Sequence, residues 1–126
     1  MADTALNNSS RFTVGEKEYT MKFTFNAMFR AEPQLTTKSL MATLAKFADS
    51  SFAMKDVFIL FKECVRAGTP EMRDKPAKDY EKLWEDMVAG YGMENVILAV
   101  TMAIVASGIF GSKKEMAEIL AATPKN

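Results

Sequence analysis

The sequence contains no histidine and only one cysteine, Cys64, among its 126 residues. Histidine is the commonest general acid or base near neutral pH and the commonest metal ligand, and disulfides and zinc sites need several cysteines. Disulfides, zinc sites and Cys–His catalysis are therefore excluded, and we expect a protein without cofactor that is not an enzyme. Sixteen basic residues balance sixteen acidic ones. This balance lacks the basic footprint of nucleic-acid-binding and membrane-surface proteins, so neither partner is expected.

A chain of this length suits one domain. Such a domain buries roughly two thirds of the surface that its unfolded chain exposes, which is enough to fold without a disulfide or metal. Residues 1–10 are small and polar and lack the apolar block of a secretory signal, so we expect a disordered N-terminus there. We expect a single domain over residues 11–122 and a flexible C-terminus over residues 123–126.

Apolar residues alternate with polar ones near the start of the chain and predict an extended, half-buried ribbon. The apolar set is Phe12, Val14, Tyr19, Met21, Phe23 and Phe25. Gly15-Glu16 between the two halves suits a two-residue type II′ turn. This turn pairs Phe12 with Tyr19 and keeps the apolar side chains on one face, which must then pack against helices.

Helical periodicity follows the ribbon. A short helix over about 27–32, capped by Asn26, is stopped by Pro33, and a second runs over about 38–48. A third, over about 54–67, precedes Gly68 in the position of a left-handed cap. A fourth, over about 77–89, ends at Gly90, a fifth spans about 93–110, and Ser112 with Glu115 predicts a capping box before a last short helix. The expected fold class is mainly α (α+β), an N-terminal β-hairpin followed by a bundle of about five to six helices.

Residues 95 to 112 contain no charged side chain. This run is shorter and more polar than a membrane-spanning helix, and a helix that is apolar on every side must be surrounded by protein. Small residues recur every fourth position, at Ala99, Ala103, Ser107 and Gly111, and form a ridge where another backbone can approach. We therefore predict a self-association or protein-binding surface over residues 96 to 110, formed by Val96, Ile97, Ala99, Val100, Ala103, Ile104, Ser107, Ile109 and Phe110.

Other groups of reactive residues favour structural roles. The acidic residues Asp74, Asp79, Glu81, Glu85 and Asp86 are interleaved with lysines and lack the spacing of a calcium loop, which predicts a solvated helix face. Cys64 falls on an apolar helix face, where a thiol is inert, and Trp84 shares a stripe with Leu83, Met87 and Val88. Ten methionines are consistent with an adaptable binding protein, because unbranched thioethers accept partners of several shapes.

Four segments occur in an order typical of one family. Gly15-Glu16-Lys17-Glu18-Tyr19 leads into Met21-Lys22-Phe23-Thr24-Phe25, and Ala27-Met28-Phe29-Arg30-Ala31-Glu32 follows. Next come Ser39-Leu40-Met41-Ala42-Thr43-Leu44-Ala45-Lys46-Phe47, and then Lys55-Asp56-Val57-Phe58-Ile59-Leu60 in a helix that closes on Arg66-Ala67-Gly68. Over residues 12 to 110 the chain resembles the tail assembly chaperones of long-tailed bacteriophages and gene-transfer particles.

The resemblance implies a non-enzymatic protein that coats the tape measure protein and helps recruit tail tube subunits. It also implies self-association into a homo-oligomer, action in the host cytoplasm and absence from the mature virion. In many relatives a longer product arises by ribosomal frameshifting, which a protein sequence does not show. A small helical adaptor of a bacterial cell, unrelated to phage tails, fits the same composition and stays open as the alternative.

Overall fold

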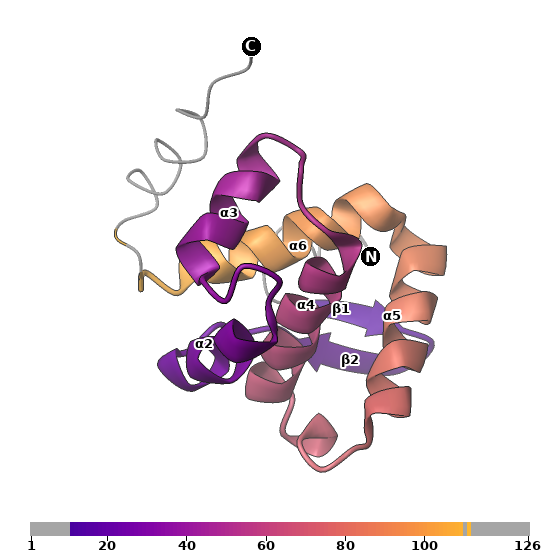
Figure 1. Cartoon of the computed structure of the whole chain (residues 1–126). Coiled ribbons are helices and arrows are strands. Elements are labelled where there is room, and N and C mark those ends of the chain that lie inside the picture. Colours follow the sequence, from indigo (N-terminus) through magenta and orange to yellow (C-terminus); the bar gives the residue numbers. More distant parts are fainter. Residues whose placement is uncertain (1–10, 110, 112–126) are drawn as a thin grey trace.

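The computed structural model describes residues 11–109 and residue 111. Two antiparallel strands, β1 (Arg11–Val14) and β2 (Lys17–Thr20), precede the helices α2 (Phe25–Ala31), α3 (Leu40–Ala48), α4 (Met54–Gly68), α5 (Ala77–Tyr91) and α6 (Met93–Ala106) (Figure 1). Single 3-10 turns, η1 (Glu32–Gln34) and η2 (Pro70–Met72), follow α2 and α4. The predicted fold class, mainly helical with a leading hairpin, is confirmed. The predicted helix after Ser112 and the expectations for both termini lie outside the described residues.

The hairpin has the predicted register. Phe12 pairs with Tyr19 and Thr13 with Glu18, and the rings of Phe12 and Tyr19 stack with centroids 5.3 Å apart. Gly15 has a φ of 63°, which is the sign that the first central position of a type II′ turn requires. Phe12 is completely buried, so the apolar face lies against the helices as the alternation predicts.

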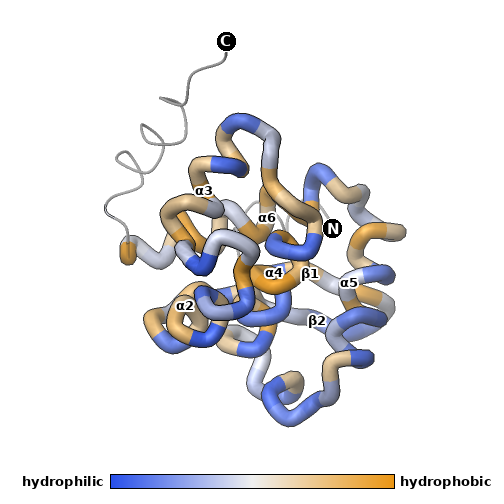
Figure 2. Tube along the Cα trace, in the orientation of Figure 1, coloured by the Kyte–Doolittle hydropathy of each residue, from blue (hydrophilic) through white to orange (hydrophobic). Residues whose placement is uncertain are grey.

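Helix α4 is the centre of the molecule and contacts α2, α5, α6 and β2. Figure 2 shows its hydrophobic stretch in the middle, with hydrophilic loops at the rim. Its buried side chains include Leu60, Phe61, Cys64 and Val65. The amide of Lys22 donates to the carbonyl of Cys64 over 3.0 Å, which fixes the chain after the hairpin directly on α4.

Gly68 differs from its prediction. Its φ is not among the positive values of the described glycines, so it forms no left-handed cap. A Cβ at this position would lie only 2.4 Å from the carbonyl oxygen of Thr20, so a close approach of β2 requires the glycine. The next residue holds the same contact: the hydroxyl of Thr69 donates to the Thr20 carbonyl over 2.8 Å and accepts from the Thr20 amide over 2.9 Å.

The start of α2 also differs from its prediction, because Thr24 caps the helix in place of Asn26. The Thr24 hydroxyl accepts from the amide of Ala27 over 3.0 Å, as an N-cap side chain does. The helix therefore begins at Phe25, which leaves the alternating ribbon and lies 59% exposed. In α3, capped by Ser39, Leu40 and Leu44 are buried, whereas Met41 is 45% exposed.

Helix α5 does not end at Gly90 as predicted but continues to Tyr91, so that Gly92 alone separates it from α6. Gly92, with a φ of 89°, makes the break in place of Gly90, and the two helices meet at 115°. The hydroxyl of Tyr91 donates to the carbonyl of Thr13 over 2.9 Å and accepts from its amide over 3.1 Å. These hydrogen bonds attach the corner between α5 and α6 to β1. Helix α6 then packs against α4 and α5.

Candidate protein-binding surface

Helix α6 carries most of the predicted surface, but the structure divides its residues between two sides. Five of the nine predicted residues are at most 3% exposed and belong to the core of this same chain: Val96, Ala99, Val100, Ala103 and Ile104. Ile97, Ser107 and Ile109 are partly buried, and Phe110 lies outside the described residues. The central residues of the predicted surface therefore lie inside this chain, where α6 packs against α4 and α5.

The ridge of small residues also faces inward. Ala99 and Ala103 are buried, and Ala103, Ala106 and Ser107 line a cavity of about 250 Å³ together with Met21 and Phe23. The ridge thus faces the segment between β2 and α2 across this cavity. Ser107 donates to the carbonyl of Ile104 over 2.6 Å, so its hydroxyl is satisfied within the helix.

The outward side of α6 is apolar. Leu98 is 56% exposed and Met102 is 36% exposed, and the partly buried side chains of Ile97 and Val105 flank them. Thr101, the polar residue between them, donates to the carbonyl of Ile97 over 2.9 Å and offers its hydrogen to no partner outside the helix. We call Ile97, Leu98, Met102 and Val105 the outer face of α6. Such an uncharged strip on a small protein is typical of a protein contact.

A second apolar feature lies at the start of α2. Phe25 and Phe29 are 59% and 64% exposed, and their ring centroids are 6.3 Å apart. Thr24, the residue before Phe25, lines the same cavity as Ala103 of α6. The alternation of apolar residues predicts Phe25 in the ribbon, so the pair was not predicted. The signal that could have found it is Thr24, an N-cap residue whose hydroxyl accepts from the amide three residues later.

Of the outer face of α6 only Ile97 is among the predicted residues; Leu98 and Met102, its exposed members, were missed. Every position from 96 to 106 is uncharged, so hydrophobicity alone cannot separate the two sides of the helix. Size does not separate the two sides either, because Val96, Val100 and Ile104 are buried together with the small residues Ala99 and Ala103.

Cys64, the only cysteine, is made unreactive by its burial. Cys64 is fully buried, and burial raises the pKa of its thiol far above the usual value, so the reactive thiolate is disfavoured. Over residues 11–109 and 111, no group of three or more acidic, cysteine or histidine side chains could hold a metal ion. On α5, Glu81 and Glu85 are exposed, and Lys82 pairs with Asp86 over 3.2 Å, as a solvated helix face would.

No single helix in the described part of the chain is long and apolar enough to cross a membrane; only the bent pair α5 and α6 meets that test, by length and composition. No model of a known protein family matches the sequence, and comparisons with curated proteins and with solved structures find no match either.

Proposed function

We propose that this protein is a non-enzymatic tail assembly chaperone that binds a tape measure protein and helps recruit tail tube subunits. It would act in the host cytoplasm and be absent from the mature virion. Two observations support the proposal: the resemblance of residues 12 to 110 to that family, and the exposed outer face of α6. The outer face carries the most weight, because it is the feature that a binding function needs.

The outer face has the spacing of a helix-binding strip. Leu98, Met102 and Val105 lie four and seven residues apart, so they form one row along α6. A long helical partner presents apolar anchors at the same intervals and can lie against such a row. Met102 adds adaptability, because its flexible thioether follows side chains of different shape. This suits a chaperone that covers successive segments of one long partner.

The same strip also suits contact between copies of this chain, as the resemblance implies. Self-association would cover Leu98 and Met102 until the partner displaces the second copy. Light scattering over a range of concentrations would then show a mass that rises above 14.0 kDa. A monomer at every concentration would remove the homo-oligomer from the proposal and leave the outer face for the tape measure protein alone.

Co-expression tests the proposed function. The protein is produced together with a tape measure protein, and the soluble yield of that long product is measured. We expect the yield to rise and the two chains to purify together. A long product that is equally soluble without this protein, and that does not purify with it, would contradict the proposal.

The alternative, a small helical adaptor of a bacterial cell, is separated by the gene's surroundings. A tail chaperone gene lies among tail genes, and many have a slippery heptamer near the last codons followed by an overlapping frame. An adaptor gene has neither. The nucleotide sequence around the last codons therefore distinguishes the two without any protein.

A further inference from the structure

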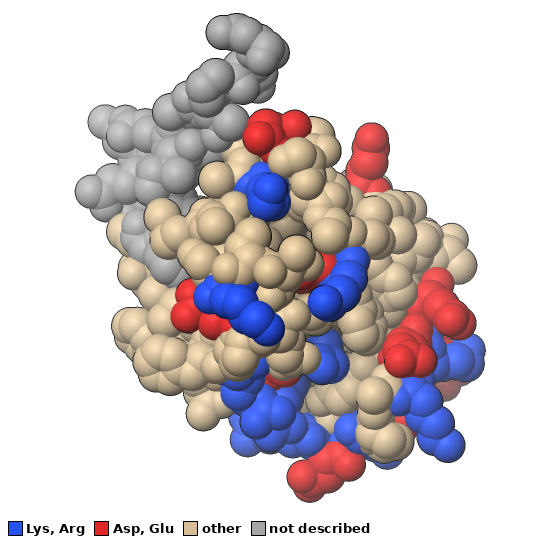
Figure 3. Space-filling model, in the orientation of Figure 1, with Lys and Arg blue, Asp and Glu red and all other residues tan. Residues whose placement is uncertain are grey.

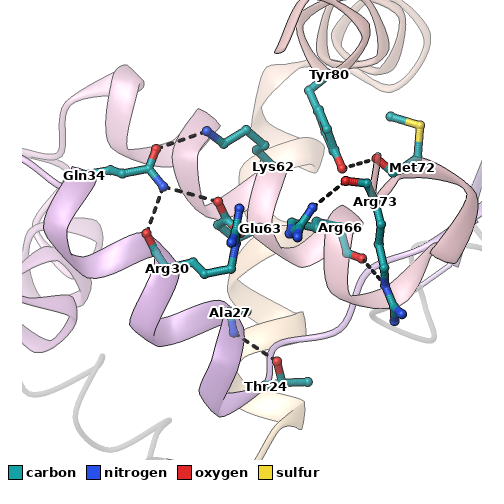
Figure 4. A network of polar contacts seen from close by, with 10 residues as sticks. All are labelled: Thr24, Ala27, Arg30, Gln34, Lys62, Glu63, Arg66, Met72, Arg73 and Tyr80. Carbon is teal, nitrogen blue, oxygen red and sulfur yellow. Dashed lines mark hydrogen bonds and ion pairs between the residues drawn. The ribbon is translucent and has the colours of Figure 1, made fainter. Parts of the chain in front are cut away.

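Glu63 is a buried carboxylate near the middle of α4, and only 1% of its side chain is exposed. One oxygen accepts from Nε of Arg30 over 3.0 Å, and the other accepts from the amide of Gln34 over 3.2 Å. Gln34 in turn accepts from Nζ of Lys62 over 3.0 Å. Figure 4 shows this network between α2 and α4. Burying a carboxylate costs free energy even when it is paired, so its presence suggests a role other than stability.

The network fixes the guanidinium group of Arg30. Because Glu63 binds Arg30 through Nε, the two terminal nitrogens of Arg30 have no hydrogen-bond partner among the described residues. The side chain of Arg30 is 47% exposed, so these nitrogens reach solvent. A guanidinium that is already oriented loses less conformational entropy when it binds a ligand.

Two further arginines are fixed beside it by main-chain oxygens. Nη1 of Arg66 donates to the carbonyl of Arg73, and Nε of Arg73 donates to the carbonyl of Arg66 over 3.3 Å. Nη2 of Arg73 also donates to the carbonyl of Ala67, over 3.4 Å. Neither arginine is paired with a carboxylate in the part of the chain described, so both positive charges remain available.

These arginines line two adjoining hollows that share Arg30, Glu63 and Arg66 as a common wall. The first, of about 300 Å³, adds Arg73 and the polar residues Thr24 and Asn26. The second, of about 170 Å³, adds Lys62 and Lys75 beside Tyr80. Five cationic side chains therefore meet one carboxylate, on a protein whose net charge is zero. In Figure 3 lysine and arginine side chains gather below the centre of this face.

We propose that the joined hollows bind the carboxylate side chains of an acidic segment of a partner protein. Arginine forks match carboxylates, and two hollows with a shared wall suit two acidic side chains that are close in sequence. A nucleic acid fits less well, because the cations form a compact cluster and the neighbouring helix α5 exposes Glu81 and Glu85. No residue of α6 lines either hollow, so the site goes beyond the proposed function and holds for a partner of any identity.

The test uses the full chain labelled with ¹⁵N and a synthetic helical peptide. The peptide carries glutamate pairs four residues apart in an alanine background, and a matched peptide carries glutamine in their place. At low ionic strength we expect the acidic peptide to shift the side-chain Nε–H resonances of Arg30, Arg66 and Arg73, and added salt to reverse the shift. Equal shifts with the glutamine peptide, or none with the acidic one, would overturn the proposal.

Charge-neutralising variants locate the site. Arg66→Gln should weaken binding of the acidic peptide about tenfold or more, since a charge-assisted hydrogen bond of about 1.4 kcal/mol corresponds to that factor. Lys55→Gln, the same charge change at the exposed start of α4, should alter it less than twofold. If circular dichroism shows that Arg66→Gln is unfolded, the double variant Lys62→Gln and Lys75→Gln replaces it, with the same expected loss. An equal loss in Lys55→Gln would show general electrostatic attraction and overturn the site.

Two other probes separate the sources of negative charge. Inorganic phosphate and a short duplex DNA are titrated under the same conditions. We expect both to bind more weakly than the acidic peptide. Tighter binding of phosphate would make the hollows a site for a free oxyanion, and tighter binding of the duplex would make them a nucleic-acid surface; either result overturns the acidic segment as the ligand.

Discussion

At the scale of single residues, Gly68 is required by its neighbour and not by its own backbone angles. A methyl group at this position would lie 2.4 Å from the carbonyl oxygen of Thr20. Gly68→Ala should therefore lower the free energy of unfolding by about 1–3 kcal/mol, the usual cost of overpacking. Urea denaturation measures this change.

Gly90 is the matched control for Gly68. It lies inside α5, and a Cβ there would meet no atom within 4 Å. Gly90→Ala should raise the free energy of unfolding by up to about 1 kcal/mol, because alanine favours a helix. Destabilisation of the same size in both variants would contradict the contact between Gly68 and β2.

Trp84 is the second residue whose role the structure specifies. Its ring meets Phe58 and Phe61 edge-on, at centroid distances of 5.6 and 5.1 Å. Trp84→Ala should cost about 3 kcal/mol of stability, since a large side chain that packs against the core would be lost. Phe29→Ala removes an exposed aromatic of α2 and should change stability by less than about 0.5 kcal/mol. A cost for Trp84→Ala as small as the cost expected for Phe29→Ala would contradict the packing of Trp84 against the core.

Cys64 should be unreactive while the protein is folded. Burial raises its pKa, so the neutral thiol is favoured in the folded state. The stability that this thiol contributes is complete below its unfolded pKa of about 8.5 and is lost as the pH rises toward the folded value. A thiol-specific disulfide reagent should react at once in denaturant and only slowly without it. Rapid reaction of the native protein at pH 7 would contradict the burial.

At the scale of elements, the hairpin was predictable and the orientation of α6 was not. Phe12 and Tyr19 share a face because strand side chains alternate, and Gly15 selects the turn, so local residues determine the register. Most of α6 lies in an uncharged run, so no charged side of the helix indicates which residues face solvent. Which side of α6 faces inward depends on how residues such as Ala99 and Ala103 pack against segments that are distant in the sequence. The sequence of the helix alone does not specify this packing.

The start of α2 and the polar network around Glu63 were also not predictable from local residues. Phe25 continues the apolar alternation, and only the hydrogen bond from Ala27 to Thr24 converts that position to helix. Glu63 looks like one more charged residue on α4. Its burial follows from α2 lying across it, and Arg30 is 33 residues away in the sequence. The basic hollows therefore could not be predicted from the spacing of charges.

The inward ridge of α6 yields an element-scale prediction. Ala99 is 1% exposed, so Ala99→Leu should force neighbouring helices apart and cost about 1–3 kcal/mol of stability. Ala106→Leu, on the exposed end of the same helix, should change stability by less than about 0.5 kcal/mol. Thermal denaturation of the two variants separates them. A neutral Ala99→Leu would mean that the ridge is free for another chain.

At the scale of the whole molecule, the outer face of α6 and the basic hollows are separate surfaces with different chemistry. The first is uncharged and suits apolar anchors, and the second is cationic and suits carboxylates. Salt should therefore weaken binding at the hollows and leave binding at the outer face little changed. A partner that uses both would be held by two contacts, of which only one depends on ionic strength.

The sharpest test is the affinity of this protein for a tape measure protein, the proposed partner. The double variant Leu98→Gln and Met102→Gln removes the apolar outer face of α6, and Met41→Gln with Met54→Gln is the control, since both methionines are 45% exposed elsewhere. We predict a loss of about tenfold or more for the α6 variant, or about 1.4 kcal/mol, and less than twofold for the control. Equal affinity of the wild type and the α6 variant would show that the outer face of α6 does not bind the tape measure protein.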